Sequence, residues 1–146
     1  NPENVFVSDV IHEALHLLQN VINEKNVKVR CQTAANMWFD KNHLRHIFIN
    51  LLTNALQAVD EGGHVDITLY QKGREKRLDI SDDGPGIEEK TMHTVFEPFF
   101  TTHSNGTGLG LAICKKLCNE NGAVIAVRNN TDKGCTFTIT AFENHD

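Results

Sequence analysis

The chain has 146 residues, of which 40% are hydrophobic and 23% charged, and its formal net charge is −5. This length and composition suit one compact domain with a sizeable core. The negative charge argues against a nucleic-acid partner, since such proteins usually present a basic surface. No apolar run approaches the roughly 18 residues of a membrane span, so we expect no membrane contact by this domain. Because the chain starts at Asn1-Pro2 without Met, we expect it to be a piece of a longer protein.

The four cysteines, Cys31, Cys114, Cys118 and Cys135, show no CxxC spacing. We expect core or surface thiols, because cysteine commonly behaves as a small buried hydrophobe. A zinc site or a disulfide is the alternative. Free thiols favour a reducing, cytoplasmic setting.

The first half of the chain alternates helical and strand patterns. Residues 8–24 carry apolar side chains at helical spacing, with Ser8 as the expected N-cap. Residues 27–31 alternate as a half-buried strand does. Asp40 is expected to cap a long helix that runs to about Val59 and is ended by Gly62-Gly63. Residues 64–70 and 76–81 form a predicted hairpin through a turn at 72–74.

The second half begins with residues 92–106, which lack periodicity and are expected to form a mobile loop. A helix from about Thr107 to Asn121 should stop at Gly122. Residues 123–129 and 135–142 then close the chain as two strands. Helices and strands mix without strict alternation, and hairpins are present. The predicted fold is therefore a two-layer α/β sandwich, with a mixed, mostly antiparallel sheet and helices on one face.

Three polar side chains share one face of the long helix, because His46, Asn50 and Asn54 lie four residues apart. Asparagine is a poor helix former, so two at this spacing call for a reason. Solvent exposure or a satisfied buried amide is one explanation. The other is that the amide oxygen of Asn54 binds Mg²⁺, which prefers oxygen ligands.

Asp82 ends the strand of the stretch SDDGPGIEEK and alternates with Leu78 and Ile80 onto the core side. A buried carboxylate needs a partner, and the exocyclic amine of a bound ligand would supply one. Gly84 and Gly86 would let the backbone approach a planar base. An ordinary Asx turn is the alternative, since Asp-Asp-Gly-Pro-Gly is strong turn chemistry.

Two further segments follow. GTGLGLAICKKL, residues 106–117, places three glycines before an amphipathic helix, where backbone N–H groups can cradle phosphate. VFEPFFTTHSN, residues 95–105, clusters Phe96, Phe99 and Phe100 in a loop-like segment. These aromatics are either a satellite core or the anchors of a lid over a ligand.

In this order and spacing, the four segments resemble the ATP-binding domain of sensor histidine kinases, within the superfamily that includes DNA gyrase, Hsp90-type chaperones and MutL. HIFINLLTNALQAV resembles the N box, DDGPGI the first glycine box, FEPFF the F box and GTGLGLAI the second glycine box. The likeness covers nearly the whole chain, with GCTFTI resembling the closing strand. It implies a Bergerat-type ATP-binding fold and a single catalytic and ATP-binding domain over residues 1–146.

The resemblance also implies roles for particular residues. The ligands would be ATP and Mg²⁺, with Asn54 as the metal ligand and Asp82 bonding the adenine amine. Asn50 and Asn54 are the catalytic candidates. The remaining expected nucleotide contacts are Gly84, Gly86, Ile87, Phe99, Thr101, Thr102, His103, Gly106, Thr107, Gly108, Leu109 and Gly110. Residues 97–106 would be the ATP lid, in which His103 replaces the lysine of many relatives.

The implied reaction transfers the γ-phosphoryl group of ATP to a histidine on a separate helical hairpin, with a response regulator downstream. Asn50 stands where ATP-hydrolysing relatives have a glutamate, and an amide is a poor general base. A standalone ATPase or a nucleotide-binding regulatory module is the alternative. The hairpin is absent from this chain: His12-Glu13 lacks the rest of the acceptor motif, and we expect His12 on the polar side of the first helix. We therefore expect no autophosphorylation by this chain alone. A membrane anchor, if the parent kinase has one, would lie outside this domain.

Overall fold

Five strands form the main sheet of the computed structural model, which describes residues 1–33, 35–98 and 110–142. The strand order is β2-β4-β5-β7-β6. The strands are β2 Lys28–Thr33, β4 His64–Lys72, β5 Glu75–Asp82, β6 Val124–Asn129 and β7 Cys135–Phe142. Only the β2–β4 pair is parallel among these strands; the other three pairs are antiparallel.

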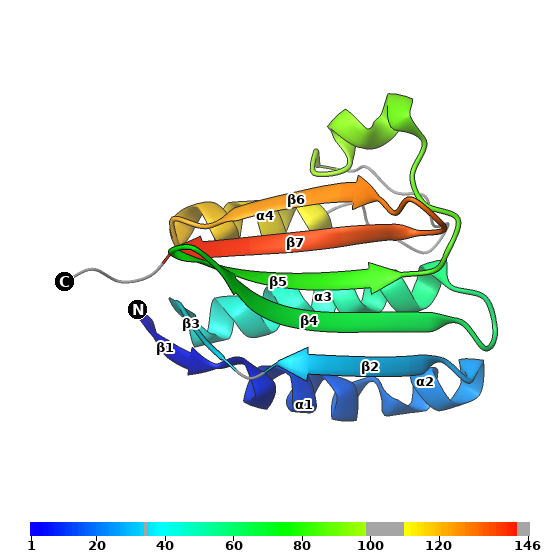
Figure 1. Cartoon of the computed structure of the whole chain (residues 1–146), viewed down its shortest axis with the longest axis horizontal. Helices are drawn as coiled ribbons and strands as arrows, with labels where there is room; N and C mark the ends of the chain where they lie inside the picture. The colour runs from blue at the N-terminus through cyan, green and yellow to red at the C-terminus, as the bar shows by residue number, and fades with distance from the viewer. Residues whose placement is uncertain (34, 99–109, 143–146) are drawn as a thin grey trace.

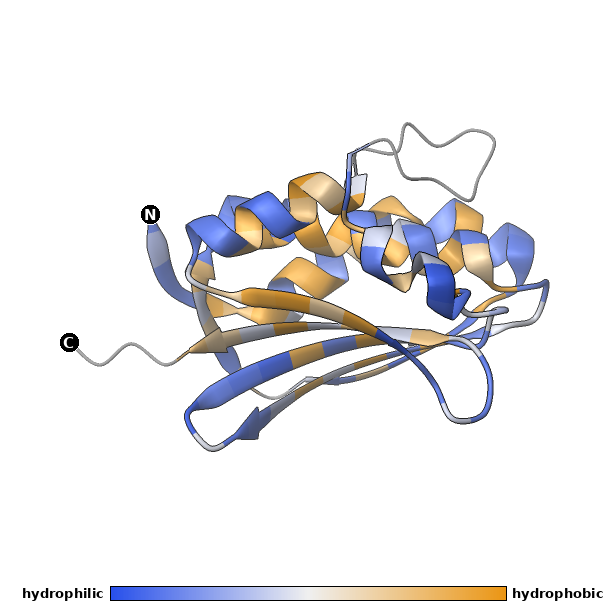
Figure 2. Ribbon diagram, turned by 90° about the horizontal axis from the view of Figure 1, so that it is seen from above, coloured by the Kyte–Doolittle hydropathy of each residue, from blue (hydrophilic) through white to orange (hydrophobic). Residues whose placement is uncertain are grey.

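Helices α1 (Val7–Leu17), α3 (Lys41–Ala58) and α4 (Gly110–Glu120) cover one face of this sheet, as Figures 1 and 2 show. The opposite face carries polar side chains such as Thr68 and Asp79, which alternate with buried residues on β4 and β5. This arrangement confirms the predicted two-layer sandwich. It also confirms the hairpin, in which β4 and β5 are joined at Gly73 and Arg74.

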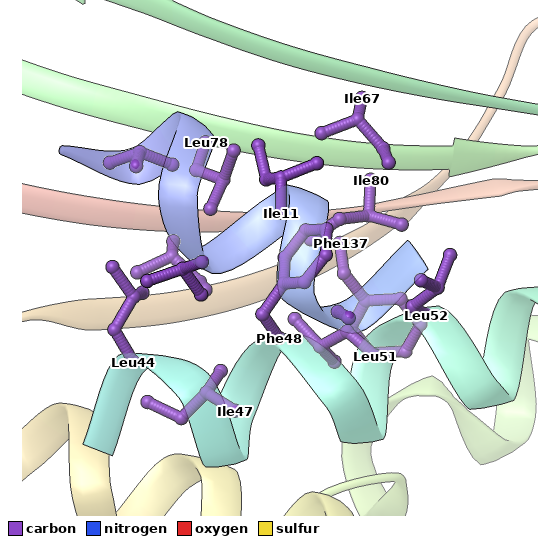
Figure 3. Close-up of a cluster of buried hydrophobic side chains, with 14 of the residues drawn as sticks. Ile11, Leu44, Ile47, Phe48, Leu51, Leu52, Ile67, Leu78, Ile80 and Phe137 are labelled. Atoms are coloured by element: carbon purple, nitrogen blue, oxygen red, sulfur yellow. The ribbon is translucent and has the colours of Figure 1, made fainter. Parts of the chain in front are cut away.

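The long helix α3 carries the largest share of the core. Its start is fixed by Asp40, whose carboxylate accepts a hydrogen bond of 3.0 Å from the His43 N–H, as predicted. Its helical periodicity places one apolar stripe against the sheet. Figure 3 shows this stripe meeting side chains of β4, β5 and α1. The fully buried members on α3 include Leu44, Ile47, Phe48, Leu51 and Leu52.

The first predicted helix is interrupted. It begins at Val7 and breaks at Leu18 into α1 and a second helix, α2 (Gln19–Lys25). The expectation that Ser8 is its N-cap is wrong, because Phe6 holds the N-cap position and makes no side-chain cap bond. No proline or glycine lies at the break, so the sequence pattern predicted one continuous helix. His12 is exposed on α1, as predicted.

A two-stranded ribbon, β1 (Pro2–Phe6) paired antiparallel with β3 (Asn36–Asp40), was not predicted. It adds Val5, Met37 and Phe39 to the core. Strand β2 does form at the expected place, but it is an exposed edge strand rather than a half-buried one, with Val29 only partly covered.

The connection between β5 and α4 differs in part from expectation. A loop was predicted over 92–106, but residues 92–94 belong to a short 3-10 helix, η1 (Glu89–Thr94). Residues 99–106 lie outside the described part of the chain. Helix α4 is described from Gly110 onward, and residues 107–109, where its start was expected, lie outside the described part of the chain. Its predicted end is confirmed, since Gly122 follows with a φ of +64°.

The cysteines are free thiols, with Cys31 exposed and the other three buried. Within residues 1–33, 35–98 and 110–142, no cluster of His, Cys, Asp or Glu could hold a metal ion. The same residues contain no helix long and apolar enough to span a membrane.

Candidate functional site

Asp82 is a buried carboxylate at the end of β5, and only 5% of the residue is exposed. It follows Leu78 and Ile80 onto the helical side of the sheet, as its alternation predicts. Its Oδ1 accepts a hydrogen bond of 2.9 Å from the Gly84 N–H, which is the Asx turn that the sequence also suggested. Its Oδ2 accepts from the Cys135 thiol at 3.5 Å. The Asx turn and the functional role are therefore compatible.

The pKa of the Asp82 carboxyl is raised above its usual value, chiefly because burial disfavours the charged form. The hydrogen bonds from Gly84 and Cys135 act in the opposite direction and only partly offset the burial. No cation pairs with this carboxylate among the described residues. A donor from a bound molecule would remove part of the cost of burying it.

The turn after Asp82 packs closely on the end of α3. A Cβ at Gly84 would lie 2.7 Å from the carbonyl oxygen of Ala58, so only glycine fits between this turn and the helix. Gly86 has a φ of +79°. The structure therefore brings the predicted glycine turn to the same end of α3 that carries Asn54.

Asn54 is half-buried on α3, and its side chain forms no hydrogen bond with another described residue. By contrast, the side chain of Asn50 donates from Nδ2 to the carbonyl of His46, one turn earlier, at 3.0 Å. Within the described part of the chain, Asn54 is therefore not the satisfied buried amide that was one of the two explanations. His46, the third polar residue of this face, is exposed.

Helix α4 begins beside this polar face of α3. A Cβ at Gly110 would lie 3.1 Å from Oδ1 of Asn50, so the first residue of α4 lies directly beside the middle of α3. Residues far apart in sequence, Asn50 and Gly110, are therefore neighbours. The free N–H groups of the first turn of α4 give this region a positive partial charge, which suits an anion.

Phe96 belongs to the aromatic cluster predicted before the lid. Its ring lies edge-on to Phe137 of β7, with the ring centroids 6.1 Å apart and the planes at 87°. Phe96 therefore anchors the segment after η1 to the core. The expected contacts Phe99, Thr101, Thr102, His103, Gly106, Thr107, Gly108 and Leu109 lie outside the described residues.

Several residues beside Asp82 were missed by the sequence reasoning. Cys135 bonds its carboxylate, and Asn130 donates from Nδ2 to its backbone carbonyl at 3.1 Å. Asn129 bonds the backbone of Ile87. The stretch NNTDKGC is recognisable only as a turn between two strands, because nothing local reveals that it meets the turn at 82–87.

A polar hollow of about 210 Å³ opens beside these turns. Its wall includes Asp66 and Ser81, which face away from the helices because they alternate with buried neighbours. It also includes His64, whose ring lies 3.0 Å from the Asp83 carboxylate. The hollow thus opens toward the polar face of the sheet, whereas Asn54 and Gly110 lie on the helical side.

Fold and site together define a nucleotide-binding domain of the histidine kinase type. The family model described as Histidine kinase-, DNA gyrase B-, and HSP90-like ATPase matches residues 39–145, and the chain belongs to this family. Sensor histidine kinase ZraS of Escherichia coli K12 is 30% identical over 138 residues, covering 92% of this chain. The chain spans 30% of the length of ZraS, so it corresponds to one part of such a protein.

Solved structures agree with this family. The catalytic domain of histidine kinase ThkA is similar with a TM-score of 0.87 and 29% identity, covering 97% of both chains. ThkA in complex with the response regulator protein TrrA is similar with a TM-score of 0.84 and 26% identity, covering 98% of this chain and 42% of that one. The fold is that of a histidine kinase catalytic domain, and the relatives named here are sensor histidine kinases.

Proposed function

We propose that this chain is the ATP-binding catalytic domain of a sensor histidine kinase and that it delivers the γ-phosphoryl group of ATP to a histidine on a separate helical-hairpin domain. A response regulator would receive the phosphoryl group afterwards, in line with the ThkA–TrrA complex. Because ATP is the donor, we place the domain in the cytoplasm. The observation that carries the proposal is the buried carboxylate of Asp82, which has no cationic partner among the described residues.

Adenine suits the surroundings of Asp82. Both carboxylate oxygens already accept one hydrogen bond from the protein, and an ionised carboxylate can accept further ones. The exocyclic amine of adenine is such a donor, whereas the carbonyl of guanine at the same position is an acceptor and would face the carboxylate unfavourably. Gly84, Gly86 and Ile87 would line the base because they follow Asp82 in the same turn.

Magnesium suits Asn54, whose amide is half-buried and lacks a hydrogen-bond partner among the described residues. A neutral oxygen ligand is sufficient when the phosphates of the nucleotide supply the negative charge. When bound, Mg²⁺ would neutralise charge on the phosphates. The N-terminus of α4 at Gly110 would bind a phosphate through its N–H groups, and the expected partners from Thr101 to Leu109 belong to the segment before it.

In the proposed reaction, a nitrogen of the acceptor imidazole attacks the γ-phosphorus. The bond from that phosphorus to the β–γ bridging oxygen breaks, ADP leaves, and the imidazole loses a proton. The domain contributes positioning and charge stabilisation, as is general for phosphoryl transfer. Its own residues need not supply a nucleophile.

Net ATP hydrolysis is the second candidate, but the position of Asn50 argues against it. Asn50 uses its Nδ2 on the carbonyl of His46, and an amide cannot remove a proton from water at neutral pH. ATP should therefore persist in the site until a histidine arrives. We expect hydrolysis by this chain alone to be slow compared with transfer to a hairpin.

The test begins with thermal melts of the chain in ATP with and without Mg²⁺, and in GTP. Ligand at about 100 times its Kd stabilises a protein by about 2.7 kcal/mol, which is several degrees for a domain of this size. The second step adds radiolabelled ATP and a hairpin bearing the acceptor histidine, with a His→Gln hairpin as control. A Mg²⁺-dependent shift with ATP but not GTP, followed by labelling of the histidine hairpin only, supports the proposal. Absence of both would contradict it, and binding with hydrolysis but no transfer would favour the ATPase.

A further inference from the structure

The turn that follows Asp82 is held mainly by side chains. Residues 83–88 belong to no helix or strand. At the end of this turn, Ile87 bonds to a side chain on a different strand rather than to a neighbouring backbone. The position of the expected adenine-contacting backbone therefore depends on residues outside the four sequence segments that predicted the site.

Asn129, the last residue of β6, makes that contact. Its Oδ1 accepts from the Ile87 N–H at 2.9 Å, and its Nδ2 donates to the Ile87 carbonyl at 2.7 Å. One side-chain amide thus satisfies both backbone groups of one residue, in the way that a neighbouring strand would. The two bonds also fix the orientation of the amide, since a flipped side chain would set donor against donor.

Gly86 makes this contact possible because it has no side chain. A Cβ at Gly86 would lie 2.8 Å from Oδ1 of Asn129, and its φ of +79° is one that other residues rarely adopt. The glycine therefore allows Asn129 to approach Ile87. A larger residue at position 86 would push Asn129 away from Ile87.

Asn130 holds the opposite end of the same turn. Its Nδ2 donates to the Asp82 carbonyl at 3.1 Å, while its Oδ1 accepts from the Thr136 hydroxyl at 2.6 Å. Gly134 lies so close that a Cβ there would be 1.9 Å from the Asp82 carbonyl oxygen. Asn129 at the end of β6, together with Asn130 and Gly134 in the turn that follows, thus contacts the segment from Asp82 to Ile87 at both ends of that segment.

We propose that Asn129 is a positioning residue for the nucleotide site, which sets Gly86 and Ile87 at the distance from Asp82 that a planar base requires. The inference rests on the proposed function, because it assigns these residues to the adenine pocket. Asn129 itself bonds backbone and needs no contact with the nucleotide. Its loss should weaken recognition of the base while leaving the phosphate end of the site, at α4, unaffected.

The first experiment compares Asn129→Ala with wild type by calorimetry, using Mg·ATP, Mg·GTP and Mg·tripolyphosphate. Loss of two neutral hydrogen bonds at an exposed position should weaken ATP binding by roughly five- to twenty-fold. The ATP-to-GTP ratio should fall, and tripolyphosphate binding should stay the same. Asn129→Asp keeps the acceptor for the Ile87 N–H and loses the donor. Its affinity for ATP should therefore be below that of wild type and no lower than that of Asn129→Ala. Asn23→Ala, an exposed asparagine on α2, is the matched control and should bind like wild type.

The second experiment measures hydrogen exchange at the Ile87 amide without nucleotide. Faster exchange in Asn129→Ala, with other core amides unchanged, supports the contact independently of ATP. Unchanged ATP affinity, an equal loss for ATP and tripolyphosphate, or unchanged exchange at Ile87 would each overturn the proposal. If wild type itself binds no ATP, the proposed function fails and this inference fails with it, even where the exchange result verifies the contact.

Discussion

The thiol of Cys135 and the carboxylate of Asp82 form a hydrogen bond across adjacent strands, with 3.5 Å between sulfur and Oδ2. Strands β5 and β7 pair antiparallel, so the end of one lies beside the start of the other. The pKa of Cys135 is raised to about 12, mainly by burial and also by the charge of Asp82, so the thiol keeps its proton and remains a donor. This bond helps to fix the orientation of the carboxylate.

Replacing Asp82 by Asn should weaken ATP binding by roughly 10- to 100-fold, because a hydrogen bond to a charged group contributes about 1.5–3 kcal/mol. The fold should survive, since an asparagine oxygen can still accept from Gly84. Calorimetry with Mg·ATP measures the effect, and Asp79→Asn on the polar face of the sheet is the control. Equal affinity for ATP in both variants would mean that Asp82 does not bind adenine.

The same substitution should stabilise the nucleotide-free protein at neutral pH. The pKa of Asp82 is raised in the folded state, so its contribution to stability is fully present below about 3.8 and is lost as pH rises through the folded pKa. The difference in Tm between Asp82→Asn and wild type should therefore grow from about pH 4 upward and then level off. A Tm difference that is constant from pH 3 to pH 8 would show that burial does not raise the pKa of this carboxyl group.

Cys135→Ala should weaken ATP binding by roughly two- to tenfold, because it removes one neutral donor from Asp82 at about 0.5–1.5 kcal/mol. Cys135→Ser keeps a donor at the same position and should bind ATP within about threefold of wild type on the same scale. Calorimetry of both variants checks this, with Cys31→Ala, an exposed thiol on β2, as control. Equal binding by the Ala and Ser variants would mean that the thiol only fills space.

Asn54→Ala should abolish the dependence of ATP binding on Mg²⁺, because it removes the proposed oxygen ligand. Titration of ATP at several Mg²⁺ concentrations measures this dependence. Gln57→Ala, at an exposed position one turn later on α3, is the control and should retain it. If Mg²⁺ tightens ATP binding equally in Asn54→Ala, the metal ligand lies elsewhere.

Asp40→Ala should lower the free energy of unfolding by about 1 kcal/mol, because Asp40 caps the long helix α3. Asp40→Asn should recover most of that loss, since asparagine is an equally good N-cap. Urea unfolding of the three proteins checks the prediction. A loss that is equal in both variants would instead show that the charge of the carboxylate, rather than its acceptor oxygen, stabilises α3.

Phe48→Ala should cost about 3–5 kcal/mol, because this fully buried ring fills the space between α3 and the sheet. Phe6→Ala makes the same chemical change at a residue that is 63% exposed and should cost far less. Urea unfolding of both variants measures the difference. Similar losses would mean that Phe6 is also a core residue.

The sequence alone determined the elements whose signals are local. Helix α3, its N-cap at Asp40 and the hairpin of β4 and β5 follow from periodicity and turn chemistry within about 20 residues. The burial of Asp82 follows from alternation with Leu78 and Ile80, because a strand sends every second side chain to the same face. The family resemblance came from four such local segments.

Only the tertiary structure decided which distant residues meet. The β1–β3 ribbon, the bond between Cys135 and Asp82, and the approach of Gly110 to Asn50 each join segments more than 25 residues apart. No helical or strand periodicity in the sequence predicts that Asn129 and Asn130 contact residues 82–87. Such contacts arise from how the whole core packs, since no local preference of the backbone records which loop will lie against another.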